Sequence, residues 1–268
     1  MGPYAGPDAF VAMAKECGFR AVTFPLSYQS PGAQIDALVR SLKDADILIA
    51  EVGAWNNNPL SPDKAEKQRS LENIKKQLEL AEYIGARCCV NVAGSHSAQW
   101  DGPAPDALSP AVFDEVVATV QEIIDAVHPQ KTGYSLETMP FMIPHSPDSY
   151  AALIKAINRP AFVGHLDTVN LINSPERYYR NAAVTRDCFD KFGDSIRSIH
   201  VKDIILRTSL TVHLDECLVG QGGYDLTVLL RNAAKLPPDT PMLVEHINNQ
   251  QDYKNSVAYL NSLAAALA

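Results

Sequence analysis

Four polar residues in the second half of the chain occupy places where a buried strand would favour apolar side chains. Each ends, or nearly ends, a short apolar segment, and the four are Glu137, Asp167, His200 and Glu245. A carboxylate or an imidazole in such a strand is costly unless it is paired, hydrogen-bonded or bound to a metal. A hydrogen bond to the backbone would explain any one of them, but all four together favour a shared role. We call these four residues the carboxylate–histidine cluster.

The donor atoms of this cluster are typical of a divalent metal site. Three carboxylates and one imidazole form a mostly hard, oxygen-rich set, which suits Mn2+, Mg2+ or Co2+ better than a structural Zn2+. We predict one bound divalent ion, with Mn2+ as the first candidate and Zn2+ as the least favoured. A dication can stabilise an enediolate while a nearby base removes a proton from a carbon next to a carbonyl.

Three reactions can begin with that proton removal. If a proton returns to the carbanion, the reaction is an isomerisation. If a second carboxylate returns the proton from the opposite face, the reaction is an epimerisation. If the carbanion expels a substituent on the next carbon, the reaction is an elimination. The residue types do not select among these outcomes.

The rest of the sequence predicts strands that alternate with helices. Ser-Pro pairs, as at Ser109-Pro110 and Ser146-Pro147, precede apolar residues at helical spacing and indicate helix starts. The predicted strands between helices are the segments 21–26, 47–53, 88–92, 133–139, 162–167, 196–202 and 242–247. This alternation predicts an α/β fold with a parallel sheet, either a doubly wound sheet or a (β/α)8 TIM barrel, and the number of strands favours the barrel.

A barrel also explains the positions of the cluster residues. They lie near the carboxyl ends of four successive predicted strands, the end at which barrel side chains converge on an active site. The first predicted helix, at about 7–17, precedes the first readable strand. We therefore expect a short or missing first strand, within or before residues 1–6. No linker or repeat divides the chain, and we predict a single domain of residues 1–268.

Composition narrows the range of partners. The 31 Asp and Glu against 23 Lys and Arg give a net charge of −8, which disfavours nucleic acid as a partner. No apolar run approaches the roughly 18 residues of a membrane-spanning helix, and no secretory signal opens the chain. The five cysteines lack the spacing of a zinc site, so we expect free thiols and a cytoplasmic protein.

Four segments resemble motifs of a known family. The segments 136–140, 164–167, 199–203 and 243–245 are similar to the strand-five to strand-eight motifs of the xylose isomerase-like sugar phosphate isomerase/epimerase superfamily. The resemblance implies a TIM barrel, a divalent metal and a keto-sugar or polyol substrate. It also implies that all four cluster residues are metal ligands and that Glu137 and Glu245 are the acid/base groups.

The chain departs from the free-ketose 3-epimerases of that superfamily. Asn170 stands where those enzymes carry a histidine, and Ile143 stands where they carry an acid. The stretches 139–144 and 170–176 also resemble a related branch, the large subunit of enzymes that cleave C-glycosides after oxidation at the sugar 3-position. We expect a metal-dependent sugar isomerase or epimerase. The alternatives are a lyase that cleaves 3-keto-glycosides and a non-catalytic, sugar-binding or regulatory barrel.

Further residues could contact a substrate. Lys202 shares a strand face with His200, and His165 lies one layer below Asp167. The other candidates follow strand ends or lie in loops over the active face, and they are Asn170, His96, His145, Glu51 and Trp55. Each could instead be an ordinary core or loop residue. The expected partner is a small carbohydrate, and the protein could form a homo-oligomer or pair with a small subunit.

Overall fold

The computed structural model describes residues 4–267 of the chain. Its strands are β1 (Ala21–Thr23), β2 (Leu48–Gly53), β3 (Cys88–Asn91), β4 (Gly133–Leu136), β5 (Gly164–Asp167), β6 (Ile196–Val201), β7 (Asp203–Leu206), β8 (Leu214–Cys217) and β9 (Met242–Val244). Its helices are α1 (Pro7–Glu16), α2 (Gly32–Asp44), α3 (Lys64–Ile84), α4 (Pro110–Val127), α5 (Pro147–Ile157), α6 (Pro175–Tyr179), α7 (Asn181–Phe192), α8 (Leu226–Ala233) and α9 (Gln250–Ala265), with the 3-10 turns η1 (Val169–Leu171) and η2 (Gly193–Ser195). Every predicted strand is present, in shortened form.

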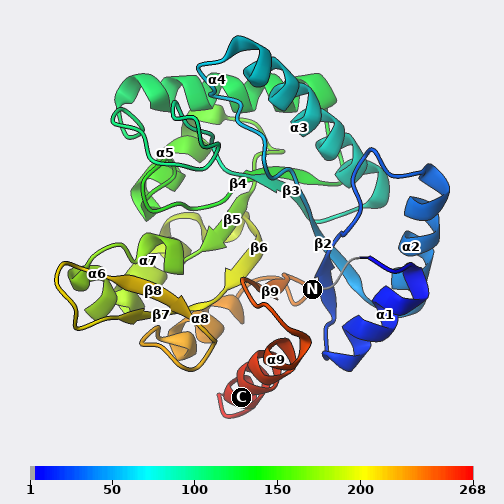
Figure 1. The fold of residues 1–268 in the computed structure, drawn as a ribbon, viewed down its shortest axis with the longest axis vertical. Coiled ribbons are helices and arrows are strands. Elements are labelled where there is room, and N and C mark those ends of the chain that lie inside the picture. The colour runs from blue at the N-terminus through cyan, green and yellow to red at the C-terminus, as the bar shows by residue number, and fades with distance from the viewer. Residues whose placement is uncertain (1–3, 268) are drawn as a thin grey trace.

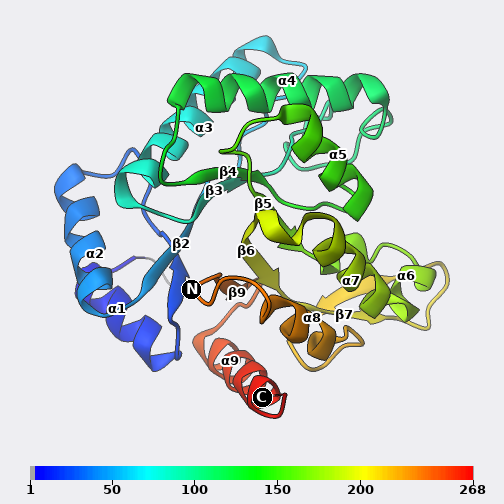
Figure 2. The same cartoon turned by 180° about the vertical axis from the view of Figure 1, so that it is seen from behind.

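Seven of the described strands run parallel to one another, and their spatial order follows their order in the chain. Hydrogen bonds join β1, β2, β3 and β4 in one sheet and β5, β6 and β9 in another. Two parallel bridges, Tyr134 to Phe162 and Glu137 to His165, connect the end of the first sheet to β5. The helices lie around these central strands, as Figures 1 and 2 show from opposite sides. This arrangement confirms the predicted (β/α)8 fold class.

The barrel is not closed by hydrogen bonds within residues 4–267. Strand β1 lies close to β9, but no ladder pairs them. Helix α1 precedes β1, as predicted, and no strand precedes α1 in the part of the chain that the structure describes. The expected place of a first strand falls partly on residues 1–3, which lie outside the described residues.

Serine side chains cap helices that begin with a Ser-Pro pair. Ser109 and Ser146 accept hydrogen bonds from the first turns of α4 and α5, and each is followed by the proline that fits the first helical position. The Ser61-Pro62 pair before α3 has the same sequence pattern but does not cap its helix. Asp63 caps that helix, while the Ser61 hydroxyl donates to Glu66 at 2.6 Å.

A hairpin that the sequence did not reveal follows β6. The predicted strand 196–202 ends at Val201, and β7 and β8 then pair as antiparallel strands. The buried Asp203 carboxylate accepts backbone N–H bonds from Gly220, Gly222 and Tyr224, and so ties the end of the hairpin to the barrel. A side chain at Gly222 would collide with Asp203, so this close approach requires glycine. The hairpin brings Glu216 towards the carboxyl end of β6.

Apolar faces of the helices pack on the strands to form the main core. The core includes fully buried Leu38, Leu42, Ile74 and Leu78 from the helices, and Ile199 and Val201 from β6. All five cysteines are unpaired, and four are buried, as predicted for free thiols. None of the helices in the described residues is long and apolar enough to cross a membrane.

Candidate metal and active site

The four cluster residues meet at the carboxyl end of the parallel strands. Glu137 directly follows β4, Asp167 ends β5, His200 is the last but one residue of β6, and Glu245 directly follows β9. Because parallel neighbours end at the same edge, these side chains converge, and one donor atom from each lies within 4.8 Å of the others. The structure therefore assembles the set of residues that the sequence pattern singled out.

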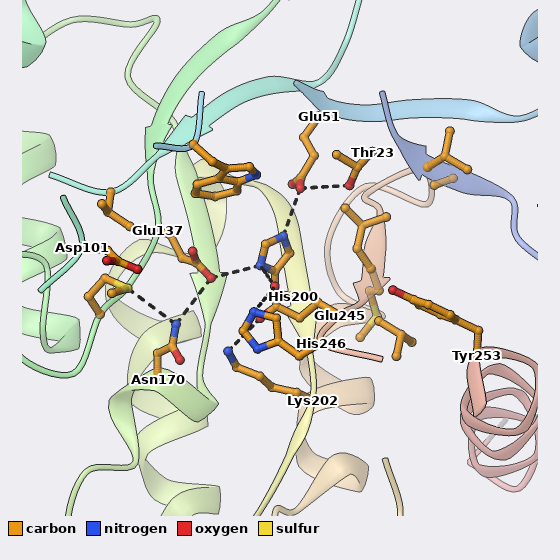
Figure 3. Close-up of a pocket in the computed structure, with 18 of the residues that line it drawn as sticks. Thr23, Glu51, Asp101, Glu137, Asn170, His200, Lys202, Glu245, His246 and Tyr253 are labelled. Carbon is orange, nitrogen blue, oxygen red and sulfur yellow. Dashed lines mark hydrogen bonds and ion pairs between the residues drawn. The ribbon is translucent and has the colours of Figure 1, made fainter. Parts of the chain in front are cut away.

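His200 lies at the centre of the cluster (Figure 3). Its Nδ1 is 2.8 Å from Glu245 Oε2 and 3.0 Å from Glu137 Oε1, while its Nε2 is 3.0 Å from Glu51 Oε1. Burial works to lower the pKa of His200, but the surrounding carboxylates raise this pKa well above the usual value. The ring therefore lies between Glu51 on one side and Glu137 and Glu245 on the other, which favours its charged form.

The cluster carboxylates differ in their pKa shifts. Burial raises the pKa of Asp167 well above the usual value, although Lys202 opposes this shift. Burial would also raise the pKa of Glu137, but the attraction of His200 outweighs it and lowers that pKa. The pKa of Glu245 is lowered too, because His200 and Lys202 together outweigh burial. Glu137 and Glu245 are thus ionised groups, as proton acceptors must be.

Lys202 lies against the cluster and is almost fully buried. Its Nζ is 2.8 Å from Asp167 Oδ2, 2.8 Å from Glu245 Oε1 and 2.9 Å from Glu216 Oε1. Burial would lower the pKa of Lys202, but these carboxylates raise it, so the ammonium stays charged. Its charge is shared among three acids, two of which belong to the cluster.

The cluster fits a divalent metal ion on the chemistry of its donors. Two of its oxygens, Asp167 Oδ2 and Glu245 Oε1, are buried, and each has the Lys202 ammonium at 2.8 Å as its neighbour. Three carboxylates this close repel one another, and a dication would relieve this repulsion. A bound ion would be held by Glu137, Asp167, His200 and Glu245, with Nδ1 as the imidazole donor that faces the carboxylates.

Glu51 lies behind His200, on the side away from the other carboxylates. Its buried carboxylate accepts hydrogen bonds from Thr23 Oγ1 at 3.2 Å and Ser198 Oγ at 3.0 Å, and it lies 3.2 Å from His165 Nε2. With His200 included, these contacts use both of its oxygens. This geometry suits a residue that orients the His200 ring. His165 is fully buried beneath the cluster and packs edge-on against His200.

A cavity of about 540 Å3 opens above the cluster. Of the other candidates from the sequence, Trp55 and Asn170 line it, as do Lys202 and Glu51. The Asn170 amide donates to Thr138 O at 3.0 Å and to Glu137 Oε1 at 3.4 Å. Asn170 therefore holds the glutamate from the side of the cavity opposite to Glu51.

His96 and His145 lie outside the lining of this cavity, in contrast to the expectation for them. The His96 ring bridges Asp106 at 2.7 Å and Glu115 at 2.9 Å, which ties the loop after β3 to α4. His145 precedes the N-cap of α5, and burial lowers its pKa. Both positions are explained by the local packing of their loops.

Several residues that line the cavity were not predicted from the sequence. Trp100, Asp101 and Phe141 come from loops after β3 and β4, and Tyr253 comes from α9. Residues in loops do not repeat with the period of a helix or a strand, so the directions of their side chains cannot be predicted from residue spacing. His246 is the exception, because it adjoins Glu245 at a predicted strand end and could have been found there.

The chain belongs to the xylose isomerase-like TIM barrel family, whose model matches residues 11–263. This match agrees with the parallel strands and the position of the cluster at their carboxyl ends. None of the curated proteins matches the chain at a significant level.

Solved structures with the same fold are distant in sequence. A xylose isomerase-like TIM barrel protein from Mycobacterium smegmatis in complex with magnesium is 18% identical with a TM-score of 0.72, over 98% of this chain and 91% of that one. An L-ribulose 3-epimerase is 15% identical with a TM-score of 0.72, over 97% and 89%. A probable 3-DHS dehydratase from Bacillus anthracis is 16% identical with a TM-score of 0.71, over 96% and 94%. At these identities the likeness shows the fold.

Proposed function

We propose that this protein is a divalent-metal-dependent isomerase or epimerase that removes a proton next to the carbonyl of a keto-sugar or sugar derivative. The observation that carries the proposal is the convergence of Glu137 and Glu245 on one site with Asp167 and His200, beneath a cavity of about 540 Å3. The fold neighbours that are a sugar epimerase and a dehydratase, and the neighbour solved with magnesium, support it.

Glu137 and Glu245 supply the proton transfers in this proposal. One carboxylate takes the proton from the carbon next to the carbonyl, and the bonding electrons move towards the carbonyl oxygen. The other glutamate must first take up a proton from solvent, and it then delivers that proton to the opposite face of the carbon, which inverts it, while the first glutamate later releases the abstracted proton to solvent. The lowered pKa of each glutamate favours the ionised form that the base needs. A divalent ion at the cluster, with Mn2+ the first candidate, would polarise the carbonyl and stabilise the developing negative charge.

The neighbouring residues hold this arrangement in place. Asn170 donates to Glu137, and Lys202 pairs with Glu245, so each of the two glutamates has its own polar neighbour. His200 Nδ1 lies within 3.0 Å of an oxygen of each of these two carboxylates. These contacts fix the direction of both glutamates, which proton transfer at a defined carbon requires.

A lyase acting on 3-keto-glycosides is the second candidate function. It uses the same first step, after which the carbanion expels the group on the adjacent carbon. The apolar side of the cavity, with Trp55 and Trp100, favours it as a place for a departing group. We expect a small carbohydrate as the partner in either case, with a homo-oligomer or a small partner subunit as a further proposal.

We expect exchange of the substrate α-proton in deuterated water, because every candidate reaction begins with that step. A panel of ketoses and 3-keto-glycosides is incubated with the Mn2+-loaded protein, and deuterium incorporation is followed by NMR. At least one member should exchange, and removal of the metal with EDTA should stop it. A panel without any enzyme-dependent exchange would contradict the proposed function.

A further inference from the structure

Asp101 is the one acidic residue of the cavity lining that has no positive charge beside it among residues 4–267. The other acids of the lining each lie at most 3.0 Å from the His200 ring or the Lys202 ammonium, and they are Glu51, Glu137 and Glu245. Asp101 instead accepts a hydrogen bond from the Gln99 side-chain amide, at 2.8 Å from its Oδ1. The neighbouring side chains therefore orient this carboxylate but do not neutralise its charge.

The loop that carries Asp101 is held in place by its own contacts. At its start, the Ser95 N–H donates to Asn58 Oδ1 at 2.8 Å, and the Asn58 amide donates back to Ser95 O at 2.8 Å. The His96 ring ties the same loop to α4. Trp100, directly before Asp101, packs against a small core beside the cavity. Asp101 is half-buried as a result, and its position at the cavity is defined.

The cavity offers no free cation to an anionic substrate. Among the described residues that line it, Lys202 is the only lysine or arginine, and its ammonium already pairs with three carboxylates. Figure 3 shows Lys202 and His246 across the site from Asp101. Phosphate and carboxylate groups are bound in proteins mainly by arginine or lysine, so an anionic group near Asp101 would be repelled.

A protonated amine is the ligand group that best suits the surroundings of Asp101. A ligand that fills the cavity removes water from this carboxylate, and a charge that loses water without gaining a partner is costly. An ammonium group supplies the opposite charge and donates charge-assisted hydrogen bonds. The ring of Trp100 favours the same group, because aromatic faces attract cations. A hydroxyl group would give one hydrogen bond and leave the charge without a partner.

We propose that Asp101 determines substrate specificity by binding a protonated amino group, so that the substrate is an amino-sugar derivative. The sugar lies over the carboxylate–histidine cluster, and its amine lies on the side of Asp101. A cavity of about 540 Å3 is within the range of about 300 to 1,000 Å3 typical of small-molecule sites. This inference rests on the proposed function for the place of the sugar. It adds the substrate class, and it excludes sugar phosphates and sugar acids.

Binding of matched sugars to the Mn2+-loaded protein tests this substrate class. Two series are measured by calorimetry at a pH at which the amines are protonated. The first is methyl glucoside with its 2-amino, 3-amino, 6-amino and 6-phosphate derivatives, and the second is D-fructose with 1-amino-1-deoxy-D-fructose. At least one amino derivative should bind about 10-fold more tightly than its parent sugar, the factor that one charge-assisted hydrogen bond can give. The 6-phosphate should bind more weakly than methyl glucoside, and added salt should reduce both differences.

Variants of Asp101 separate recognition of the charge from a general sugar-binding role. Asp101→Asn keeps the shape and removes the charge, so it should remove the advantage of the amine and leave the affinity for the parent sugar unchanged. Asp101→Glu keeps the charge and should retain part of the advantage. Asp114→Asn is the control, because Asp114 is an exposed acid on α4 that does not line the cavity. It removes the same charge from the chain and should change no affinity.

Three results would overturn the inference. No amino derivative binds more tightly than its parent sugar, the 6-phosphate binds as tightly as the best amino derivative, or the preference for amines survives in Asp101→Asn. The last result would mean that the amine binds elsewhere, for example at the metal ion.

Proton exchange provides the separate test of the proposed function. A protein that prefers amino sugars through Asp101 but exchanges no α-proton would contradict the proposed function and support this substrate class. A protein that exchanges the α-proton of ketoses without any preference for amino sugars would do the reverse.

Discussion

Glu137→Gln and Glu245→Gln should each lower turnover by about 10²- to 10⁴-fold while most of the metal stays bound. That range is typical for loss of a general acid or base. Glutamine keeps the shape of glutamate and one oxygen that can bind a metal, but it cannot accept the substrate proton. Metal content and turnover therefore change independently in these variants, and both are measured on the same preparation.

Proton exchange measured separately from inversion tests whether the two glutamates act on opposite faces of the substrate carbon. If the reaction is an epimerisation, a variant with one glutamate intact should still exchange the substrate α-proton with solvent but fail to invert the carbon. Glu115→Gln serves as the matched control, because Glu115 pairs with Lys67 and His96 outside the cavity lining. Full turnover in both active-site variants would assign these glutamates a structural role only and would move the acid/base role to Lys202 or another residue.

Glu51→Gln should weaken Mn2+ binding by about 10- to 100-fold, the effect typical of losing a hydrogen-bond partner of a metal-binding histidine. Glu51 Oε1 lies 3.0 Å from His200 Nε2, so the carboxylate holds the proton on that nitrogen and leaves Nδ1 to face the metal ligands. An uncharged amide removes this attraction and can donate to Nε2, which favours the wrong tautomer of the ring.

A purely structural role of Glu51 would give a different pattern. Ser198→Ala is the companion variant, because it removes one hydrogen bond to Glu51 and leaves the charge. It should weaken Mn2+ binding much less than Glu51→Gln does, while both variants should unfold near the temperature of the unaltered protein. Equal loss of thermal stability and unchanged Mn2+ affinity in Glu51→Gln would show that the residue only supports the core.

The sequence was sufficient to locate the cluster because burial and spacing act on each strand separately. Glu137, Asp167 and Glu245 stand at the ends of apolar segments, where period-two alternation and the parallel order place them on one face. The same local signals predicted that α1 precedes the first strand. The Ser-Pro pattern did not locate every cap, because Asp63 and not Ser61 caps α3.

The supporting residues could not be located in this way. Glu216 reaches Lys202 only because β7 and β8 form a hairpin, and no alternation over 207–223 indicates that pairing. Trp100 and Phe141 lie in loops, and Trp100 packs against a small core that contains Val92, Ala107 and Met142. Glu51 was chosen as a candidate on the expectation that it follows a strand end or lies in a loop over the active face, and that expectation was wrong. Glu51 lies inside β2, and its hydrogen bonds connect residues far apart in the chain.

Calorimetric titration of Mn2+ into the metal-free protein and its His200→Ala variant tests the central claim most directly. The unaltered protein should take up about one equivalent in a single saturable transition, because the cluster supplies four donors to one ion. His200→Ala should bind Mn2+ far more weakly, since it removes the only nitrogen donor among the four. Uptake below roughly 0.1 equivalent in the unaltered protein, or identical binding in the variant, would contradict the assignment of this cluster as the metal site.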